Sequence, residues 1–291
     1  MRKVSARFSN VSGQLRPVTN GPKIFGILNI TEDSFSDGGR YLDPVAALAA
    51  ARSLAGGGAH VVDIGAAASN VDAQPVTSDE EIRRLEPVIA ALQADGIAVS
   101  VDSFTLATQR FALHAGVDFL NDIEGFSEPA LYPELAAARC RLVVMHAVQG
   151  RGRAQRVAVP PKAIWPRLEA FFTQRITALT AAGIDRERLI LDPGMGFFLS
   201  SDARASFTVL ASLDRLKRHF GLPVLVSVSR KSFLAAVTGC AAPESRGAAT
   251  LAAELYAAAK GVDFIRTHDP AALRDGLAVM AALNDAEAAI E

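Results

Sequence analysis

The feature that most constrains this chain is a repeated alternation of two sequence textures, which begins after residue 22. Short runs rich in Val, Ile and Leu are followed by longer stretches in which Ala, Leu, Arg and Glu recur at helical spacing. A continuous apolar run is typical of a strand that is covered on both faces, as in a parallel sheet. The alternation therefore predicts a series of strand–helix units. The expected strands are 24–30, 59–64, 98–102, 117–121, 142–146, 189–192, 223–228 and 263–266, and the expected helices are 44–54, 79–92, 107–114, 134–138, 163–182, 203–220, 248–260 and 271–283.

The number of units separates two α/β architectures. A (β/α)8 barrel typically uses ~250 residues, and the eight expected strands and eight expected helices fall within residues 23–291. An open doubly wound sheet usually has fewer strands and often a Gly-rich fingerprint after the first strand, where this chain reads Asn29-Ile30-Thr31. We therefore expect an α/β fold, a single-domain (β/α)8 TIM barrel. Residues 1–22, with four basic and no acidic residues, are expected to form an unstructured leader, a transit peptide being the alternative.

Composition excludes several classes of function. The chain has 30 Lys and Arg against 31 Asp and Glu, so no overall basic footprint for nucleic acid is present. Cys140 and Cys240 lie far apart in the sequence, which argues against a disulfide framework or a Cys-based zinc site and suits a reducing cytoplasm. No stretch approaches the ~18 apolar residues of a membrane span. We expect a cytoplasmic protein that acts on small molecules.

A polar side chain stands at or just after the end of every expected strand. In a barrel these strand ends meet at one rim, which is where the active site lies. Each residue has a structural alternative: an aspartate can cap the next helix, and a histidine can be a core imidazole. Their convergence favours a site. The residues are Asn29, Asp63, Asp102, Asn121, Asp122, His146, Asp192, Ser227, Ser229, Arg230, Lys231, Arg266 and His268.

The charges at these strand ends indicate the ligand chemistry. The last two strands, the habitual phosphate corner of this fold, carry basic residues that predict an anion site: Arg230, Lys231, Arg266 and His268. The alternative is a solvated basic pair. Asp102, Asn121 and Asp192 present mainly hydrogen-bond acceptors, with the Asn adding donors. Such a group would match a flat heterocycle with an amino-pyrimidine edge.

Four segments, each after its own strand, carry a resemblance to a known family. They read FGILNITEDSFSDGG at 25–39, LDPGMGF at 191–197, SRKS at 229–232 and RTHD at 266–269. In these segments, and over about residues 24–283, the chain resembles the dihydropteroate synthases, most closely their sulfonamide-insensitive (Sul-type) branch. The resemblance implies a transferase that joins 6-hydroxymethyl-7,8-dihydropterin diphosphate to 4-aminobenzoate. The implied products are 7,8-dihydropteroate and pyrophosphate, in folate biosynthesis.

The resemblance also implies residue roles. Asp102, Asn121, Asp192 and Lys231 are expected to bind the pterin, and Ser229 to lie near the aminobenzoate carboxylate. Asn29, Arg266 and His268 are expected to bind the diphosphate, with Asn29 helping to ligate Mg²⁺, and the catalytic set is Asp192, Lys231, Arg266 and His268. The diphosphate is expected to leave first, giving a pterin-methyl cation that the aromatic amine captures without a side-chain nucleophile. Loops 31–39 and 66–74 are expected to close over the site, and the enzyme to be a homodimer.

Two departures from the ordinary family pattern bear on the second substrate. Residues 66–71 read Ala-Ala-Ala-Ser-Asn-Val where ordinary members have a Glu-Ser-Thr-Arg-Pro type segment, so the family's loop arginine is missing. Phe198 and Leu199 replace a small residue and a lysine. We expect Phe197 and Phe198 to reshape the aminobenzoate pocket so that bulkier sulfonamides clash, giving sulfonamide resistance. The alternative is that one of these rings is ordinary core packing.

Two other functions fit part of this evidence. Methyltetrahydrofolate-using methyltransferases of corrinoid pathways share the pterin-binding Asp and Asn residues but lack the residues that bind a diphosphate. The loop at 31–39 and Arg266-Thr267-His268 therefore favour the synthase over such a methyltransferase. A non-catalytic pterin-binding paralogue would explain the missing loop arginine, although Asn29 and Lys231 are retained.

Overall fold

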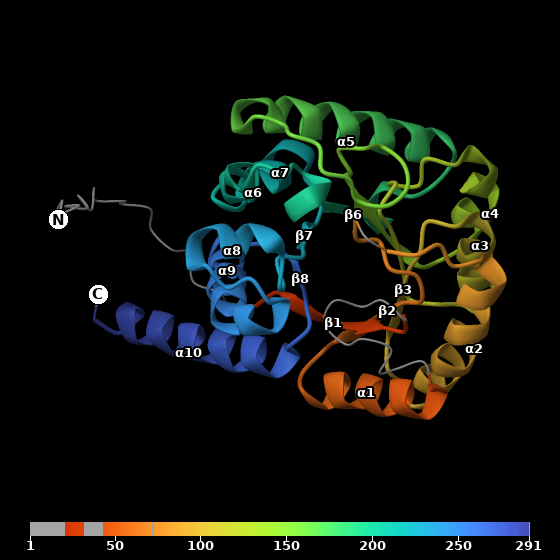
Figure 1. Ribbon diagram of the computed structural model, residues 1–291, viewed down its shortest axis with the longest axis horizontal. Helices are drawn as coiled ribbons and strands as arrows, with labels where there is room; N and C mark the ends of the chain where they lie inside the picture. The colour runs from red at the N-terminus through yellow and green to blue at the C-terminus, as the bar shows by residue number, and fades with distance from the viewer. Residues whose placement is uncertain (1–20, 32–42, 72, 291) are drawn as a thin grey trace.

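The computed structural model describes residues 21–31, 43–71 and 73–290, and Figure 1 shows the strands at the centre with helices around them. Most of the expected leader and most of the loop at 31–39 lie outside these residues. The strands are β1 (Lys23–Asn29), β2 (Val61–Gly65), β3 (Val99–Asp102), β4 (Phe119–Asp122), β5 (Arg141–Met145), β6 (Leu189–Asp192), β7 (Leu225–Val226) and β8 (Phe264–Thr267). The α-helices are α1 (Pro44–Gly56), α2 (Ser78–Ala94), α3 (Leu106–His114), α4 (Tyr132–Ala137), α5 (Ile164–Ala181), α6 (Ala203–Leu210), α7 (Asp214–Phe220), α8 (Ser232–Thr238), α9 (Gly247–Ala259) and α10 (Pro270–Ala288).

The strands form one parallel sheet that curls on itself. Its order is β6-β5-β4-β3-β2-β1-β8-β7, so each strand lies beside its neighbours in the chain and β8 lies beside β1. A parallel bridge between Leu191 and Val224 joins the two ends of the sheet. The expected (β/α)8 barrel is thereby confirmed. The carboxyl ends of all the strands consequently face one rim.

Local chemistry at the strand–helix junctions explains where several helices begin. Asp43 caps α1 by accepting hydrogen bonds from the backbone N–H groups of Val45 and Ala46, and Pro44 occupies the first turn. Asp269 likewise caps α10 through the N–H of Ala272. A carboxylate at this position satisfies donors that have no partner inside the helix. Asp269 therefore starts a helix rather than binding a ligand.

Two sequence expectations about the last third of the barrel were wrong. The stretch 203–220 forms two helices, α6 and α7, and not one. At the break the Ser212 hydroxyl donates to the Thr208 carbonyl, a side-chain bond that competes with helix continuation. A helix was also missed: α8 begins at Ser232, with five residues between it and β7, and is capped by Gly239, whose φ of 73° is the left-handed conformation that favours glycine. The expected strand 223–228 is shorter in the structure, Leu225–Val226.

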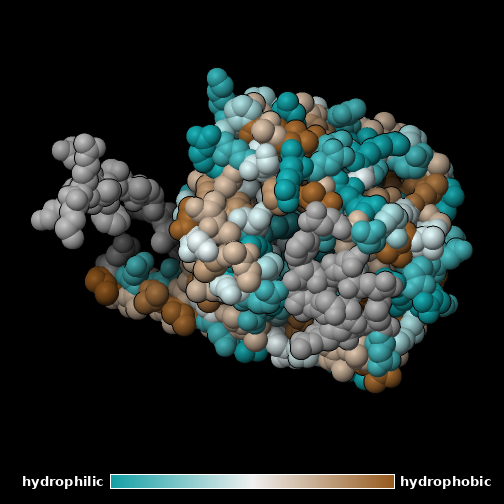
Figure 2. All heavy atoms as spheres, viewed as in Figure 1, coloured by the Kyte–Doolittle hydropathy of each residue, from teal (hydrophilic) through white to brown (hydrophobic). Residues whose placement is uncertain are grey.

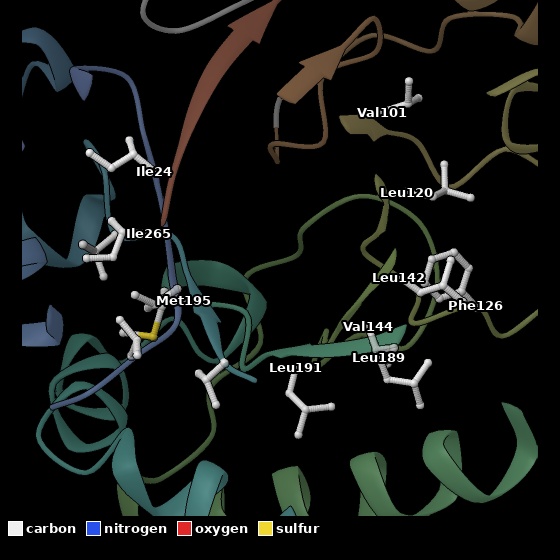
Figure 3. Packing of buried hydrophobic residues seen from close by; sticks show 14 of the residues in the cluster. Ile24, Val101, Leu120, Phe126, Leu142, Val144, Leu189, Leu191, Met195 and Ile265 are labelled. Atoms are coloured by element: carbon white, nitrogen blue, oxygen red, sulfur yellow. The ribbon is translucent and has the colours of Figure 1, made fainter. Parts of the chain in front are cut away.

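Side chains alternate between the two faces of every strand and so divide the core in two. Outward-facing residues such as Ile24, Leu120 and Leu191 pack beneath the helices, as Figure 3 shows. Inside the barrel, Phe25, Phe119 and Phe264 form an edge-to-face cluster with ring centroids 5.0 to 6.3 Å apart. These rings belong to the amino-terminal half of their strands. Because they fill the floor of the barrel, a ligand can enter at the carboxyl-terminal rim.

The surface has few large exposed apolar side chains. None of the described helices is long and apolar enough to cross a lipid bilayer. Polar and apolar residues are interspersed over the face in Figure 2, with apolar residues along the edge where α10 ends. The large hydrophobic residues that are exposed are Val45, Val237, Tyr256, Val279, Leu283 and Ile290.

Candidate active site

The strand register places four inward positions at one level of the barrel. Asn29 pairs with Gly65, Gly65 with Asp102, and Asp102 with Asn121 across four neighbouring strands. Residues paired in register point to the same face of a sheet, so the side chains of Asn29, Asp102 and Asn121 point into the barrel. Above this level a cavity of about 450 Å³ opens at the rim, which is the size of a typical small-molecule site.

Most of the residues predicted to bind substrate line this cavity. Asn121 and Asp192 are not among its lining residues: they lie almost fully buried at the ends of β4 and β6. Their predicted roles as pterin ligands are not tested by the geometry. The predicted residues that line the cavity are Asn29, Asp102, Phe197, Phe198, Ser229, Lys231, Arg266 and His268. The loop at 66–74 also contributes, through residues 67–71.

Arg266 is held between two carboxylates. Its Nε donates to Asp63 Oδ2, and its Nη2 donates to Asp102 Oδ2 at 2.8 Å. Asp63 lies two residues before Gly65 on β2, so it also points inward, one level below the cavity. The sequence reading named Asp63 as a strand-end residue but gave it no role. Its structural role is to orient the guanidinium, since a paired planar fork is fixed in direction.

Burial shifts the pKa values of the charged groups around this pair. Desolvation raises the pKa of Asp192 to about 6 and that of Asp102 to about 7, while Arg266 and Lys231 oppose both shifts. Desolvation lowers the pKa of Lys231 to about 8, with Arg266 adding to the effect and the two aspartates opposing it. Groups with perturbed pKa values that share a cavity are typical of functional sites. These four groups thus form a buried charged cluster with two acids and two cations.

His268 is neutral in this arrangement. Burial, with Arg230, Arg266 and Lys231 nearby, lowers the pKa of its imidazole well below 6.5. Its Nδ1 lies 2.9 Å from the Ser229 hydroxyl, which also accepts from the His268 backbone N–H. Ser229 therefore orients the imidazole, in addition to its predicted place near the aminobenzoate carboxylate. An anion bound beside His268 would favour the charged imidazole.

Two asparagines at the inward level of the barrel can each offer an amide oxygen to a ligand. The buried Asn121 Oδ1 accepts no hydrogen bond from any described group, and unpaired buried acceptors of this kind call for an explanation such as a missing ligand. Asn29 lines the cavity and has an amide oxygen of the hard type that Mg²⁺ prefers. In the described residues no three His, Cys, Asp or Glu side chains cluster as a metal site. Asn29 therefore fits a Mg²⁺ whose other ligands are water and substrate oxygens.

The part of the cavity wall that adjoins Lys231 is aromatic. Phe197 and Phe198 lie in the short helix η4 (Gly196–Phe198) that follows β6. Phe198 is buried against Ile123 and Met145, with the Lys231 Nζ 5.2 Å from its ring centroid, so it contributes both to packing and to the cavity wall. Phe197 is less buried, and the guanidinium carbon of Arg156 lies 5.7 Å from its ring centroid. Arg156 also lines the cavity and was missed, because it lies in a long loop away from any strand end.

Two strand-end residues serve the scaffold instead. Asp122 accepts from the N–H groups of Glu124 and Phe126 and so braces the loop after β4. His146 is buried, with its Nδ1 3.2 Å from the Pro193 carbonyl oxygen. The backbone segments that follow β5 and β6 lie very close together. A Cβ at Gly194, where φ is 70°, would clash with the His146 carbonyl oxygen. This contact fixes the direction in which the loop carrying Phe197 leaves the barrel.

Comparisons with known proteins agree with this geometry. Residues 25–268 match the model of the pterin binding enzyme family. The chain is 61% identical over 262 residues to dihydropteroate synthase type-2 of Escherichia coli, covering 90% of this chain and 96% of that one. It is 51% identical over 255 residues to dihydropteroate synthase type-1 of Pseudomonas aeruginosa, covering 87% and 91%.

Solved structures agree in fold as well as in sequence. A Yersinia pestis dihydropteroate synthase with a sulfonamide drug complex superposes with a TM-score of 0.84 at 32% identity, covering 91% of this chain and 95% of that one. A Xanthomonas albilineans dihydropteroate synthase with 4-aminobenzoic acid superposes with a TM-score of 0.82 at 37% identity, covering 91% and 93%. Family model, sequence relatives and structures all span the barrel that carries the cavity. The chain therefore belongs to the dihydropteroate synthases of the pterin binding enzyme family.

Proposed function

We propose that this chain condenses 6-hydroxymethyl-7,8-dihydropterin diphosphate with 4-aminobenzoate, releasing pyrophosphate and 7,8-dihydropteroate. The observation that carries the proposal is one cavity with two chemically distinct sides. A buried cluster of acids and cations forms one part of the site, and the aromatic Phe197 and Phe198 form an adjoining part, with the Lys231 Nζ 5.2 Å from the Phe198 ring centroid. A relative of known structure binds 4-aminobenzoic acid, and another from the same organism binds 7,8-dihydropteroate.

The pterin would lie against the buried cluster. Asp102 and Asp192 would accept hydrogen bonds from its ring N–H and amino groups, and the open Asn121 Oδ1 would accept a further one. Lys231 would hold Asp192 in its ionised state by its charge. Ionised carboxylates next to the ring would also stabilise positive charge that develops on the pterin when the diphosphate departs.

The departing diphosphate would lie by the β8 rim. Arg266 and His268 would donate to its oxygens, and Asn29 would hold a Mg²⁺ that supplies further positive charge when bound. Arg266 is oriented for this role by Asp63 and Asp102. Protonation of His268 on binding the diphosphate would strengthen its contact. No nucleophilic side chain is needed, because the amine of the second substrate attacks the pterin methylene carbon once the bond to diphosphate has broken.

We further propose that the enzyme is of the Sul type and resists sulfonamides. Phe197 and Phe198 form a bulky corner that lines the cavity. Phe198 is fixed by packing against Ile123 and Met145, so the corner cannot withdraw easily from a larger ligand. A sulfonamide carries substituents beyond the position of the carboxylate, and these would clash with such a corner while 4-aminobenzoate fits.

A homodimer in the cytoplasm is the expected state of the enzyme. Val237, Tyr256, Val279 and Leu283 are exposed on α8, α9 and α10, and α9 contacts both of the other helices. Apolar side chains on adjoining helices suit a subunit interface. Both cysteines are free, as in proteins of a reducing compartment. Light scattering of the parent protein should give twice the chain mass. Leu283→Glu, which places a charge on this face, should give the mass of a monomer. A monomeric parent protein would contradict the proposal.

A coupled assay decides the function. The purified chain, given the pterin diphosphate, 4-aminobenzoate and Mg²⁺, should release pyrophosphate and form dihydropteroate in equal amounts. A corrinoid-pathway methyltransferase would release no pyrophosphate. A non-catalytic pterin-binding protein would also fail to restore growth of a strain that lacks its own dihydropteroate synthase, whereas this chain should restore it, with a sulfonamide present as well as without.

A further inference from the structure

The cations that line the cavity differ in what already engages them. Arg266 is paired with Asp63 and Asp102. Arg246 donates to the backbone carbonyls of Cys240 at 2.9 Å and Arg230 at 2.6 Å, and also to that of Ala241, so its guanidinium is used in holding the loop after α8. Lys231 belongs to the buried cluster with Asp192. The guanidinium groups of Arg266 and Arg246 are therefore engaged by the protein itself, and Lys231, whose Nζ lies 5.2 Å from the Phe198 ring centroid, is already assigned to the pterin.

Arg230 and Arg156 are the two lining arginines whose side chains carry no hydrogen bond or ion pair to any described residue. The charge of Arg230 is felt by His268, the residue expected to bind the diphosphate, and it lowers the pKa of that imidazole. Arg156 lies on the other side of the cavity, where its guanidinium contacts the Phe197 ring. Phe197 belongs to the aromatic corner, so Arg156 lies beside the place where an aryl group would lie and, unlike Lys231 at Phe198, has no role in binding the pterin.

The loop that carries Arg156 is anchored on both sides of it. The Ala154 N–H donates to the Ser69 carbonyl at 2.9 Å, which ties the loop to the segment after β2. The Val157 carbonyl accepts from the Ser201 N–H at 2.8 Å, and the Val159 N–H donates to the Ser200 hydroxyl at 2.9 Å. The backbone of Arg156 is therefore fixed between two walls of the cavity, while its long side chain stays exposed to solvent and able to reorient.

We propose that Arg156 is a specificity-determining residue that binds the carboxylate of the aryl amine substrate. The inference rests on the proposed condensation with 4-aminobenzoate. It adds the residue that recognises the negative charge of the substrate carboxylate. A guanidinium can bind a carboxylate through two parallel hydrogen bonds while it lies over an aromatic ring, and the Arg156 guanidinium lies over the Phe197 ring without a hydrogen bond to any described residue. The Ser229 hydroxyl alone is uncharged and already bonded to His268. Arg156 thus selects an anionic aryl amine over a neutral one.

Arg156→Ala, Arg156→Lys and the control Arg151→Ala test this assignment. Arg151 is exposed in the same loop but does not line the cavity. Removal of Arg156 should raise the KM for 4-aminobenzoate by about tenfold, the usual loss of one charge-assisted contact. The kcat and the KM for the pterin diphosphate should stay within about twofold. Lysine should recover part of the loss, because it keeps the charge but not the bidentate geometry, and Arg151→Ala should match the parent.

A neutral competitor separates charge recognition from a structural role. The inhibition constant of 4-aminobenzamide, which lacks the charge, should be the same for the parent and for Arg156→Ala. Equal losses for the acid and the amide would overturn the proposal and show that Arg156 only supports Phe197. An unchanged KM in Arg156→Ala, with a raised KM in Ser229→Ala, would also overturn it. Failure of the proposed function looks different, because the parent enzyme itself would then form no dihydropteroate.

Discussion

The two sides of the cavity are built in contrasting ways. On the β6–β8 side, Asp192 and Arg266 project from barrel strands and Lys231 from the start of α8. Asp192 is buried, the two cations are half-buried, and the three groups influence one another by charge. On the other side, Phe197 and Arg156 project from connecting segments, are partly exposed, and contact each other through a ring face. A group on a strand has its direction set by the sheet register, whereas a group on a loop depends on a few anchoring bonds.

This difference separates chemistry from selection. The strand side holds the groups that would bind the pterin and the leaving diphosphate, where a displacement of one charge disturbs its partners. The loop side would determine which aryl amine, or which inhibitor, can enter beside it. We therefore expect substitutions on the strand side to reduce catalysis and those on the loop side to change preference. The following predictions test this division.

The largest effect is expected for Lys231→Met. Loss of this cation leaves Asp192 and Asp102 without one of the two charges that stabilise their ionised forms. We expect kcat/KM for the pterin diphosphate to fall by about 10²–10³-fold, as for removal of one preorganised electrostatic contact. Lys162→Met, which changes an exposed lysine outside the cavity, is the matched control and should keep full activity. A fall in kcat/KM of less than threefold for Lys231→Met would contradict the division between catalysis on the strand side and selection on the loop side.

Asp192→Asn should lower activity and raise stability together. Burial raises the pKa of Asp192 to about 6, above its ordinary value of 3.8, so the folded state binds this proton more tightly than the unfolded state. The stability that this preference contributes is full at low pH and is lost as pH rises through about 4 to 6. The asparagine can still accept from the Gly194 N–H, as Asp192 does at 2.8 Å, and it carries no charge to bury.

The measurement is thermal unfolding of parent and variant at pH 5 and pH 7.5, beside the assay. The advantage of Asp192→Asn should grow with pH to about 2–3 kcal/mol, and its kcat/KM should fall about 10²-fold. A variant that unfolds below the parent at pH 7.5 would show that the carboxylate stabilises the fold, and the buried cluster would then not be a strained functional site.

Phe197→Gly should change inhibition more than catalysis. Removing this ring opens the aromatic corner, so a sulfonamide should inhibit about tenfold more strongly, a change typical of altered fit in an apolar pocket. The kcat should remain within severalfold of the parent value. The matched control is Val45→Ala, which changes an exposed residue on α1 that does not line the cavity and should leave inhibition unchanged. If sulfonamide inhibition stays as weak as in the parent, Phe197 does not exclude the drug.

The smallest effect is expected in the pH profile of the parent. The pKa of Lys231 is lowered to about 8, so this lysine loses its proton as pH rises through about 8. The kcat/KM for the pterin diphosphate should therefore fall severalfold between pH 7.5 and pH 9. Lys231→Arg keeps its charge over this range and should show a flat profile, although at lower activity. A decline of equal steepness in Lys231→Arg would assign the titration to another group.

The parts of this protein that depend on periodicity were predictable from sequence. Continuous apolar runs at regular intervals give parallel strands with helices between them, and eight such units close a barrel. The strand-end positions of Asn29, Asp102, Lys231 and Arg266 followed from that closure, since all strands of the barrel run in the same direction. The break between α6 and α7 did not follow, because the residues between them continue the same helical spacing of apolar side chains.

The sequence by itself determined the barrel, the rim and the residue types that meet there, because the pattern of apolar and polar residues sets which face of each element is buried. Tertiary structure alone decided which of those residues touch. In the folded chain Arg266 pairs with Asp63, and Arg156 contacts Phe197, which is 41 positions away in the sequence. Asp122 and His146 instead make hydrogen bonds or close contacts with the backbone of the scaffold. Such contacts depend on the register of strands and on how loops return to the rim, and no local pattern of residues records either.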